Sequence, residues 1–256
     1  MLIDSHAHLD DRRFNDDRDM LIKNFKNNNI ELVINIGADL KTSVASVELA
    51  DKYDTIYAAV GVHPHSAKEV NTLVMENIRE LTKNKKVVAI GEIGLDFHYD
   101  NSPRDVQRKW FIEQLKLAKE LDLPVIIHTR EASQETYDIL KNNQDGTVRG
   151  VMHSFSGSAE MASLYVDMGF YISIGGPVTF KNARVVREVA EAVPLDKLLI
   201  ETDCPYLTPE PYRGKRNEPV YMKYTAEKIA QVRGISYDEV VKATNRNAKK
   251  LFNIKD

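Results

Sequence analysis

The stretch MLIDSHAH at residues 1–8 carries the strongest signal for the fold of this chain. Its apolar start predicts a short β-strand, and the two-residue period of a strand places His6 and His8 on one face at the carboxyl end. Two imidazoles placed in this way can bind one metal ion, whereas a hydrogen-bonded pair of core histidines has the same spacing. The pair alone leaves both interpretations open.

Short β-type runs alternate with longer amphipathic segments along the whole chain. We expect strands at residues 2–6, 32–36, 56–61, 87–92, 124–128, 149–153, 170–174 and 197–202. Apolar residues at helical spacing predict helices at residues 17–27, 42–53, 71–84, 104–121, 133–143, 159–168, 183–192 and 220–233. Ser236 and Glu239 form a capping-box pair that predicts one more helix. This order indicates an α/β protein, a single-domain TIM-type (β/α)8 barrel over residues 1–256, with an open doubly wound sheet as the alternative.

Composition narrows the class of protein. A length of 256 residues with 43% hydrophobic residues suits one globular domain and argues against disorder. The lone Cys204 excludes an internal disulfide, and the apolar run at the N-terminus is too short for a signal peptide or a membrane span. We therefore expect a cytoplasmic protein that does not contact membranes, with a monomer as a plausible state. The net charge of −3 means that a polyanionic substrate must be attracted by local cations or by a bound metal.

Four more metal-capable residues end their own predicted strands: Glu92, His128, His153 and Asp203. In a barrel the carboxyl ends of the strands meet, so these residues would share one cup with the two histidines of the first strand. This set exceeds the three protein ligands of a typical catalytic zinc ion, which favours two ions.

We assign His6, His8 and Asp203 to one ion, and His128 and His153 to the other, with Glu92 as the bridge. A single ion, with some of the histidines in supporting positions, is the alternative. Asp203 is also a candidate proton acceptor, which makes Asp203 and Glu92 the expected catalytic residues.

Candidate substrate contacts follow the predicted strands. His63 suits contact with a phosphate or protonation of a leaving oxygen, and Arg130 suits an anion clamp. Arg213 and Arg216 lie in the cationic segment YRGKRN at residues 212–217, which suits a nucleic-acid backbone. Each has an ordinary alternative: a structural loop histidine, a local ion pair or a solvated loop. Glu201 is expected to orient a ligand histidine or to form a structural salt bridge.

Seven segments together make the chain recognisable. They are DSHAHL at 4–9, GVHPH at 61–65, GEIGLD at 91–96, LPVIIH at 123–128, HSFSG at 153–157, ETDCPYL at 201–207 and RGKRNEP at 213–219. With them the chain resembles the TatD family of metal-dependent deoxyribonucleases, within the amidohydrolase-like superfamily. The resemblance implies a TIM-type barrel, the six residues named above as ligands of divalent metal ions, and hydrolysis of DNA phosphodiester bonds, often from the 3′ end. Glu92 stands where many binuclear amidohydrolases carry a modified lysine, which points away from that subgroup.

These observations favour a two-metal deoxyribonuclease that acts on 3′ ends or single strands of DNA. One alternative is a metal-dependent amidohydrolase or esterase of a small cyclic amide or ester. Another is a metal-binding quality-control or interaction protein without turnover. The mixed nitrogen and oxygen ligands fit Mg²⁺, Mn²⁺, Zn²⁺ or Ni²⁺, and the sequence does not select among these metals.

Overall fold

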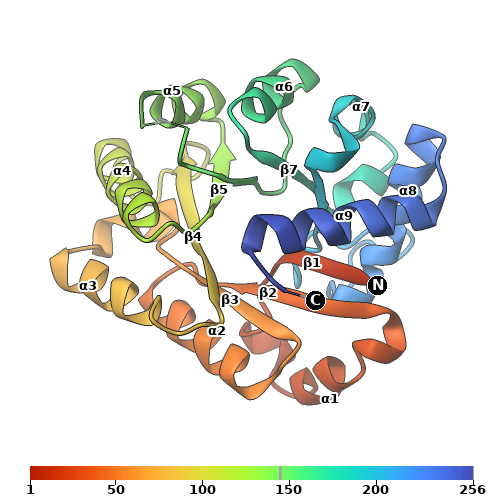
Figure 1. The fold of residues 1–256 in the computed structure, drawn as a ribbon, viewed down its shortest axis with the longest axis horizontal. Helices are drawn as coiled ribbons and strands as arrows, with labels where there is room; N and C mark the ends of the chain where they lie inside the picture. The colour runs from red at the N-terminus through yellow and green to blue at the C-terminus, as the bar shows by residue number, and fades with distance from the viewer. Residues whose placement is uncertain (144–145, 256) are drawn as a thin grey trace.

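The strands form one parallel sheet that curls into a barrel (Figure 1). The computed structural model describes residues 1–143 and 146–255. Each strand pairs with the next in chain order, from β1 to β8. Two backbone hydrogen bonds then join β1 to the segment after β8, from His8 N to Cys204 O at 2.8 Å and from Asp203 N to His6 O at 2.9 Å. The expected single-domain TIM-type barrel is therefore confirmed, in a nearly closed form.

Helices alternate with these strands and surround them. The strands are β1 (Leu2–Ala7), β2 (Ile30–Ile36), β3 (Ile56–Val60), β4 (Val87–Asp96), β5 (Val125–Arg130), β6 (Gly150–Met152), β7 (Tyr171–Ile174) and β8 (Leu198–Ile200). The α-helices are α1 (Arg18–Lys23), α2 (Leu40–Lys52), α3 (Thr72–Leu81), α4 (Arg104–Glu120), α5 (Ser133–Asn143), α6 (Ala159–Asp167), α7 (Arg184–Ala192), α8 (Met222–Arg233) and α9 (Tyr237–Phe252). None of the helices in the described ranges combines the length and the apolar character needed to cross a bilayer.

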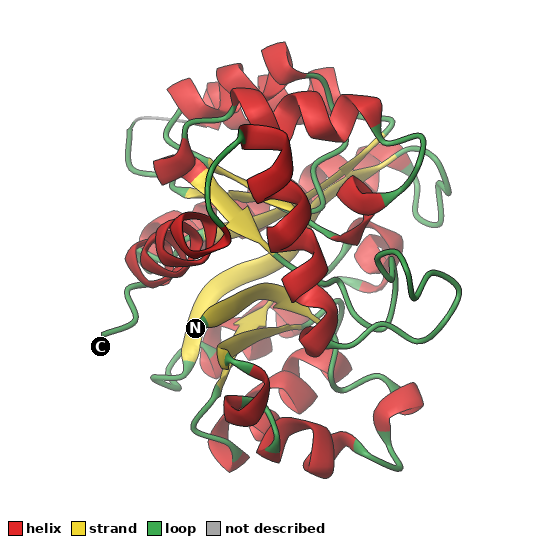
Figure 2. Ribbon diagram, turned by 90° about the vertical axis from the view of Figure 1, so that its right-hand side faces the viewer, coloured by secondary structure: helices red, strands yellow, loops and turns green. Residues whose placement is uncertain are grey.

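The hydrophobic core has an outer and an inner layer. The outer layer lies between the strands and the surrounding helices. The inner layer fills the barrel with residues such as Ile34, Ile126 and Leu199, and it continues into Leu251 and Phe252 of α9. Helix α9 thus covers the end of the barrel near both termini, and the longer loops extend on the opposite side (Figure 2). The carboxyl ends of the strands remain free to build a site.

Strands β4 and β5 are longer than the sequence pattern predicts. They stay paired beyond the expected ends at Glu92 and His128, up to the pair Asp96 and Arg130. Gly94 permits this pairing, because its φ is +143° and a Cβ atom there would lie 1.9 Å from the carbonyl oxygen of His128. The extension carries Asp96 above the rim of the barrel, on the same side of the strand as Glu92.

Two irregularities in the ladders turn side chains into the barrel. From Asp4 to Ala7, β1 advances three residues while β2 advances two, from Val33 to Asn35. The same mismatch occurs in β4 between Ile90 and Ile93, against Val125 and Ile127 of β5. An extra residue switches which face the following side chains occupy, and such bulges commonly re-aim side chains beside active sites. His6 and Glu92 lie within these two irregular stretches.

Several other predicted elements are shorter in the structure, and for two of them the contacts show why. The helix expected at 17–27 ends at Lys23, because Asn24 and Asn28 bond their side-chain amides to backbone carbonyls and compete with helix continuation. The last strand ends at Ile200, because Thr202 donates its N–H to the Asp4 side chain at 2.9 Å instead of to a ladder partner.

Candidate metal centre

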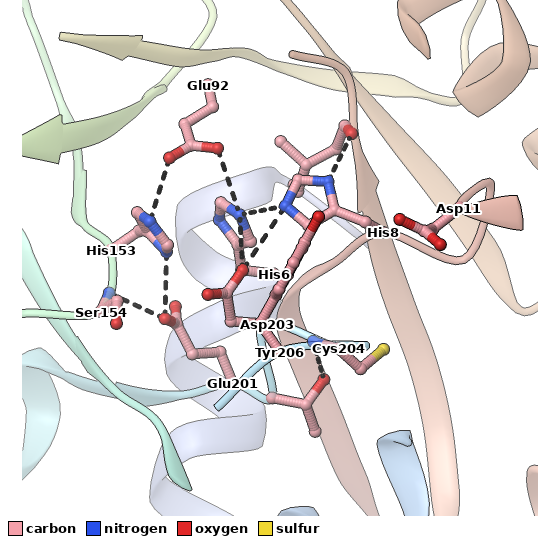
Figure 3. Close-up of polar contacts among 12 residues, drawn as sticks. His6, His8, Asp11, Glu92, His153, Ser154, Glu201, Asp203, Cys204 and Tyr206 are labelled. Carbon is pink, nitrogen blue, oxygen red and sulfur yellow. Dashed lines mark hydrogen bonds and ion pairs between the residues drawn. The ribbon is translucent and has the colours of Figure 1, made fainter. Parts of the chain in front are cut away.

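Glu92 and the five other predicted ligands, from five strand ends in all, meet in one cup. Figure 3 shows His6, His8, Glu92, His153 and Asp203 of this set. Glu92 is 4% exposed, so its two oxygens face protein groups rather than bulk water. Oε2 lies 3.6 Å from His6 Nε2. Oε1 lies 2.9 Å from His128 Nδ1 and 3.0 Å from His153 Nε2. One carboxylate therefore presents a different oxygen to each of the two predicted groups of histidines.

The first group consists of His6, His8 and Asp203. The Nε2 atoms of His6 and His8 lie 3.2 Å apart. Asp203 Oδ1 lies 3.7 Å from the first of these nitrogens and 3.5 Å from the second. Two imidazole nitrogens and a carboxylate oxygen converging in this way form a donor set that suits a divalent cation.

The remote nitrogens of three of the predicted ligand histidines are held by oxygen acceptors. The pairs are His8 Nδ1 with Ile36 O at 3.1 Å, His128 Nε2 with Asp96 Oδ2 at 3.2 Å, and His153 Nδ1 with Glu201 Oε1 at 3.1 Å. In metal sites the second nitrogen of a ligand imidazole usually donates to a carboxylate or a backbone carbonyl, which fixes the tautomer and aims the lone pair at the ion. The residues present thus fit a metal centre. In the described part of the chain, the buried Nδ1 of His6 has no hydrogen-bond partner.

The carboxylates of the cup are held in their charged form. Burial alone would raise the pKa of Glu92, but His153, His63 and His128 around it hold the pKa well below its usual range. Burial likewise opposes ionisation of Asp203, and the hydrogen bond with His8 and the charges of His153 and His6 lower its pKa. Both groups are therefore ionised at neutral pH, as a metal ligand must be.

The histidines divide into two electrostatic classes. Burial lowers the pKa of His6, and the adjacent His153 lowers it further. Burial opposes protonation of His8 too, but the Asp203 carboxylate raises its pKa to about 9. Glu92 and Glu201 raise the pKa of His153 well above its usual value in the same way. The protons on His8 and His153 balance the negative charge of the carboxylates, and a bound cation would balance the same charge in their place.

His63 also lies in this cup, although its position in the motif at 61–65 left that open. Its Nδ1 accepts the backbone N–H of His65 at 3.1 Å, so its Nε2, 3.6 Å from Glu92 Oε1, carries the hydrogen of the neutral ring. Burial keeps the pKa of His63 well below its usual value, so the ring is neutral. It presents an N–H donor to the cup.

The predicted substrate arginines lie in different environments. Arg130 lines the cavity above the cup and stacks over Tyr99, with its guanidinium carbon 4.8 Å from the ring centroid. Arg216 instead binds Asp17 at 2.6 Å and Glu218 at 2.8 Å. Arg213 is exposed, with its guanidinium carbon 4.2 Å from the Phe180 ring. Neither Arg213 nor Arg216 lines the cavities at the cup, so the structure brings only Arg130 to the predicted metal ligands.

The cup opens into two connected lobes. A lobe of about 800 Å³ extends over the loops after β1 and β2 and includes Arg12 and Lys41 in its wall. A lobe of about 550 Å³ extends over the loops after β6, β7 and β8 and includes Phe155, Val186 and Leu207. Both lobes reach the predicted ligands His128, His153 and Asp203. We call them the charged lobe and the apolar lobe.

Asp96 is a site residue that the sequence patterns did not single out. It is 1% exposed, and one of its oxygens, Oδ2, lies 2.9 Å from His65 Nε2 and 3.2 Å from His128 Nε2. Its parity with Glu92 along one strand was the available signal, but the strand was expected to end at Glu92. His65, from the motif at 61–65, therefore supports the carboxylate that orients the predicted ligand His128.

Comparison with known proteins gives a consistent result. Residues 3–253 match the model of a family described as TatD related DNase. The chain is 48% identical over 254 residues to an uncharacterized metal-dependent hydrolase, YabD, of Bacillus subtilis, covering 99% of this chain and 100% of that one. It is 36% identical over 250 residues to the 3′-5′ ssDNA/RNA exonuclease TatD of a Rahnella species, covering 95% of each chain. The crystal structure of YJJV, a TatD homologue from Escherichia coli, superposes with a TM-score of 0.93 at 32% identity, covering 99% of this chain and 98% of that one.

Proposed function

Since the chain belongs to the TatD family of metal-dependent hydrolases, we propose that it is a deoxyribonuclease that removes nucleotides from the 3′ end of single-stranded DNA with two divalent ions. The family and the hydrolase class are established by the similarity over nearly the whole chain. The substrate, the polarity and the number of ions are our proposal. A relative named as a 3′-5′ ssDNA/RNA exonuclease supports the choice of a nucleic-acid end.

The observation that carries the two-metal proposal is the position of Glu92. Its Oε2 faces His6 at 3.6 Å, and its Oε1 faces His128 at 2.9 Å. A carboxylate between two donor groups can bridge two ions, and paired ions clamp the attacking and leaving oxygens of a phosphoryl transfer. In the proposed site, His6, His8 and Asp203 hold one ion, and His128 and His153 hold the other. When bound, these ions would lower the pKa of a water molecule and offset charge on the phosphate.

The protein groups supply the remaining steps. The Asp203 carboxylate is ionised and can accept the proton of the attacking water. The neutral His63 offers its Nε2–H as a hydrogen-bond donor to a phosphate oxygen. Arg130, which has no ion pair with any described residue, is available at the rim to bind a second phosphate. These roles require nothing beyond the contacts already present.

The proposal is tested with metal-free protein and DNA labelled at the 5′ end. Mg²⁺, Mn²⁺, Zn²⁺ and Ni²⁺ are added separately, and products from single-stranded and double-stranded substrates are separated by length. We expect a ladder shortened one nucleotide at a time from the 3′ end, stronger for single strands and absent with chelator. Hydrolysis of a small cyclic amide, with DNA left intact under every metal, would contradict the proposal.

A further inference from the structure

The two lobes at the cup differ in chemistry, and this difference suggests how a strand lies across the site. The apolar lobe is lined by Tyr99, Phe155, Pro177, Val186 and Leu207. Apart from Arg130 and the predicted ligands that it shares with the cup, its lining residues carry no charged side chain. Its wall is therefore suited to a flat, weakly polar group rather than to a phosphate.

The charged lobe has the opposite character. Arg12 and Lys41 are exposed in its wall, and neither forms an ion pair within the described residues. Its carboxylates are already engaged: Asp10 accepts from Asn35 at 2.9 Å, Asp11 binds Arg13 at 2.8 Å, and Asp39 accepts the N–H of Thr42 at 2.7 Å. Arg12 and Lys41 are therefore the side chains in this wall that can contact the phosphates of an anionic chain.

We propose that the apolar lobe binds the base of the 3′-terminal nucleotide, while the charged lobe carries the phosphates of the rest of the strand. The proposal rests on the proposed 3′ exonuclease function. It assigns to the lobe beside β6, β7 and β8 a subsite for the nucleoside 5′-monophosphate that the reaction would release.

The size and the aromatic residues of the apolar lobe support placing the 3′-terminal nucleotide there. The apolar lobe of about 550 Å³ is large enough for one nucleotide, since pockets that bury one small ligand measure roughly 300–1,000 Å³. Tyr99 lines this lobe and not the charged lobe, whereas Tyr206 lines both. The two residues are 54% and 49% exposed, and Arg130 and Arg13 each stack over one of the rings, so the exposed ring surface that remains is available to a base. The larger lobe, about 800 Å³, leaves room for the chain to leave the site.

Equilibrium binding tests the subsite without relying on turnover. The metal-loaded protein is titrated with dAMP and with 2-deoxyribose 5-phosphate, which has the same phosphosugar without the base. We expect dAMP to bind about 10- to 100-fold more tightly, the effect of one stacked base. Equal affinities for the two probes would overturn the proposal.

Two variants test whether the difference in affinity between dAMP and the phosphosugar arises in the apolar lobe. Val186→Trp fills the lobe from α7, and Leu207→Trp fills it from a side chain that is 38% exposed and so carries little risk to folding. Both should lose the preference for dAMP and keep the affinity for the phosphosugar. Leu164→Trp on α6 is the matched control, since Leu164 is 41% exposed and lines neither lobe. A preference that survives in Leu207→Trp would overturn the assignment.

A comparison of DNA strands with and without a 3′-terminal base tests the subsite and the proposed nuclease function separately. A strand that ends in an abasic 3′ nucleotide should be shortened about 10- to 100-fold less efficiently than a normal strand, and Leu207→Trp should cleave the two ends equally. Equal cleavage of both strands by the wild-type protein would support the nuclease and refute the subsite. Tight, lobe-dependent binding of dAMP without cleavage of any strand would support the subsite and contradict the nuclease.

Discussion

At the scale of single residues, the site is built from carboxylates that each contact more than one protein group. Glu201 is fully buried, and its Oε1 accepts both from His153 Nδ1 at 3.1 Å and from the backbone N–H of Ser154 at 2.7 Å. This contact with a predicted ligand histidine fits an orienting residue, and the same pair is a salt bridge while His153 is protonated. Carboxylates in this position raise the basicity of a ligand imidazole and fix its tautomer.

We predict that Glu201→Gln lowers metal affinity by about 10- to 100-fold, because the amide keeps the acceptor oxygen and loses its negative charge. The measurement is a competition titration of metal-free protein with a chromophoric chelator. Glu188→Gln, at an exposed position on α7, is the matched control and should leave the affinity unchanged. Unaltered affinity in Glu201→Gln would mean that Glu201 only anchors the backbone.

Arg130 and Arg216 were both predicted to contact substrate, and the structure leads us to expect different roles for them. Arg130→Ala should weaken single-strand binding and lower the log–log salt slope by about one unit, because one phosphate contact is lost. Arg216→Ala should leave the slope unchanged and reduce the free energy of unfolding by roughly 1 kcal/mol, since it breaks a partly exposed ion pair with Asp17.

Fluorescence anisotropy at several salt concentrations measures both slopes, on an Asp203→Asn background that prevents turnover. A lower slope in Arg216→Ala would show that this side chain leaves its ion pairs to contact DNA, as the sequence alone suggested. An unchanged slope in Arg130→Ala would remove Arg130 from the proposed phosphate contacts.

At the scale of elements, the order of strands and helices could be predicted from periodicity, and their ends could not. Alternating β-type and amphipathic runs specify the barrel because each segment buries its own apolar residues. The continuation of β4 to Asp96 depends on pairing with β5, whose Ile127 lies far from Ile93 in the chain and meets it only in the folded sheet. The ion pair of Arg216 with Asp17 likewise joins distant residues, so local patterns could not show that this arginine is occupied.

Because β4 and β5 approach closely at Gly94, we predict that a larger residue there strongly destabilises the protein. Gly94→Ala should reduce the free energy of unfolding by about 3 kcal/mol or more, because a Cβ atom would collide with the carbonyl of His128 at 1.9 Å. Gly169→Ala is the control: its φ is +92° and no atom lies within 4 Å of an added Cβ, so only backbone strain of about 1 kcal/mol is expected. Chemical denaturation measures both values, and equal losses would contradict the proposed packing role of Gly94.

At the scale of the whole molecule, α9 and the inner core cover one end of the barrel, and the other end gathers the ligand set. The six predicted ligands could be found from the sequence because each lies where a predicted strand ends. Asp96 and the two lobes could not be found, since they depend on the strand extension and on loops whose arrangement has no periodic signal.

The number of protons released on metal binding tests whether His8 is a metal ligand. The raised pKa of His8, about 9, means that the metal-free site is protonated at pH 7, and a protonated imidazole cannot bind a metal. Metal affinity should therefore increase as pH rises toward 9, with protons released on binding. In metal-free protein the stabilising pair of His8 with Asp203 is fully present below about pH 6.5 and is lost as pH rises through 9.

Calorimetric titration in buffers of different ionisation enthalpy counts these protons. Affinity that is constant from pH 6.5 to pH 9, with no proton release, would contradict the assignment of His8 as a ligand.

The central claim is that Glu92 joins two ions in one hydrolytic site, and metal content measured together with nuclease rate in two variants tests it most directly. Asp203→Asn keeps the shape of the side chain and loses the proton acceptor, so turnover should fall about 10²- to 10⁴-fold while the ion held by His128 and His153 is retained. We expect two ions per chain in the wild-type protein, and Glu92→Ala removes the carboxylate between them, so metal content and activity should fall together. Two tightly bound ions in Glu92→Ala, or a near-normal rate in Asp203→Asn, would contradict the account.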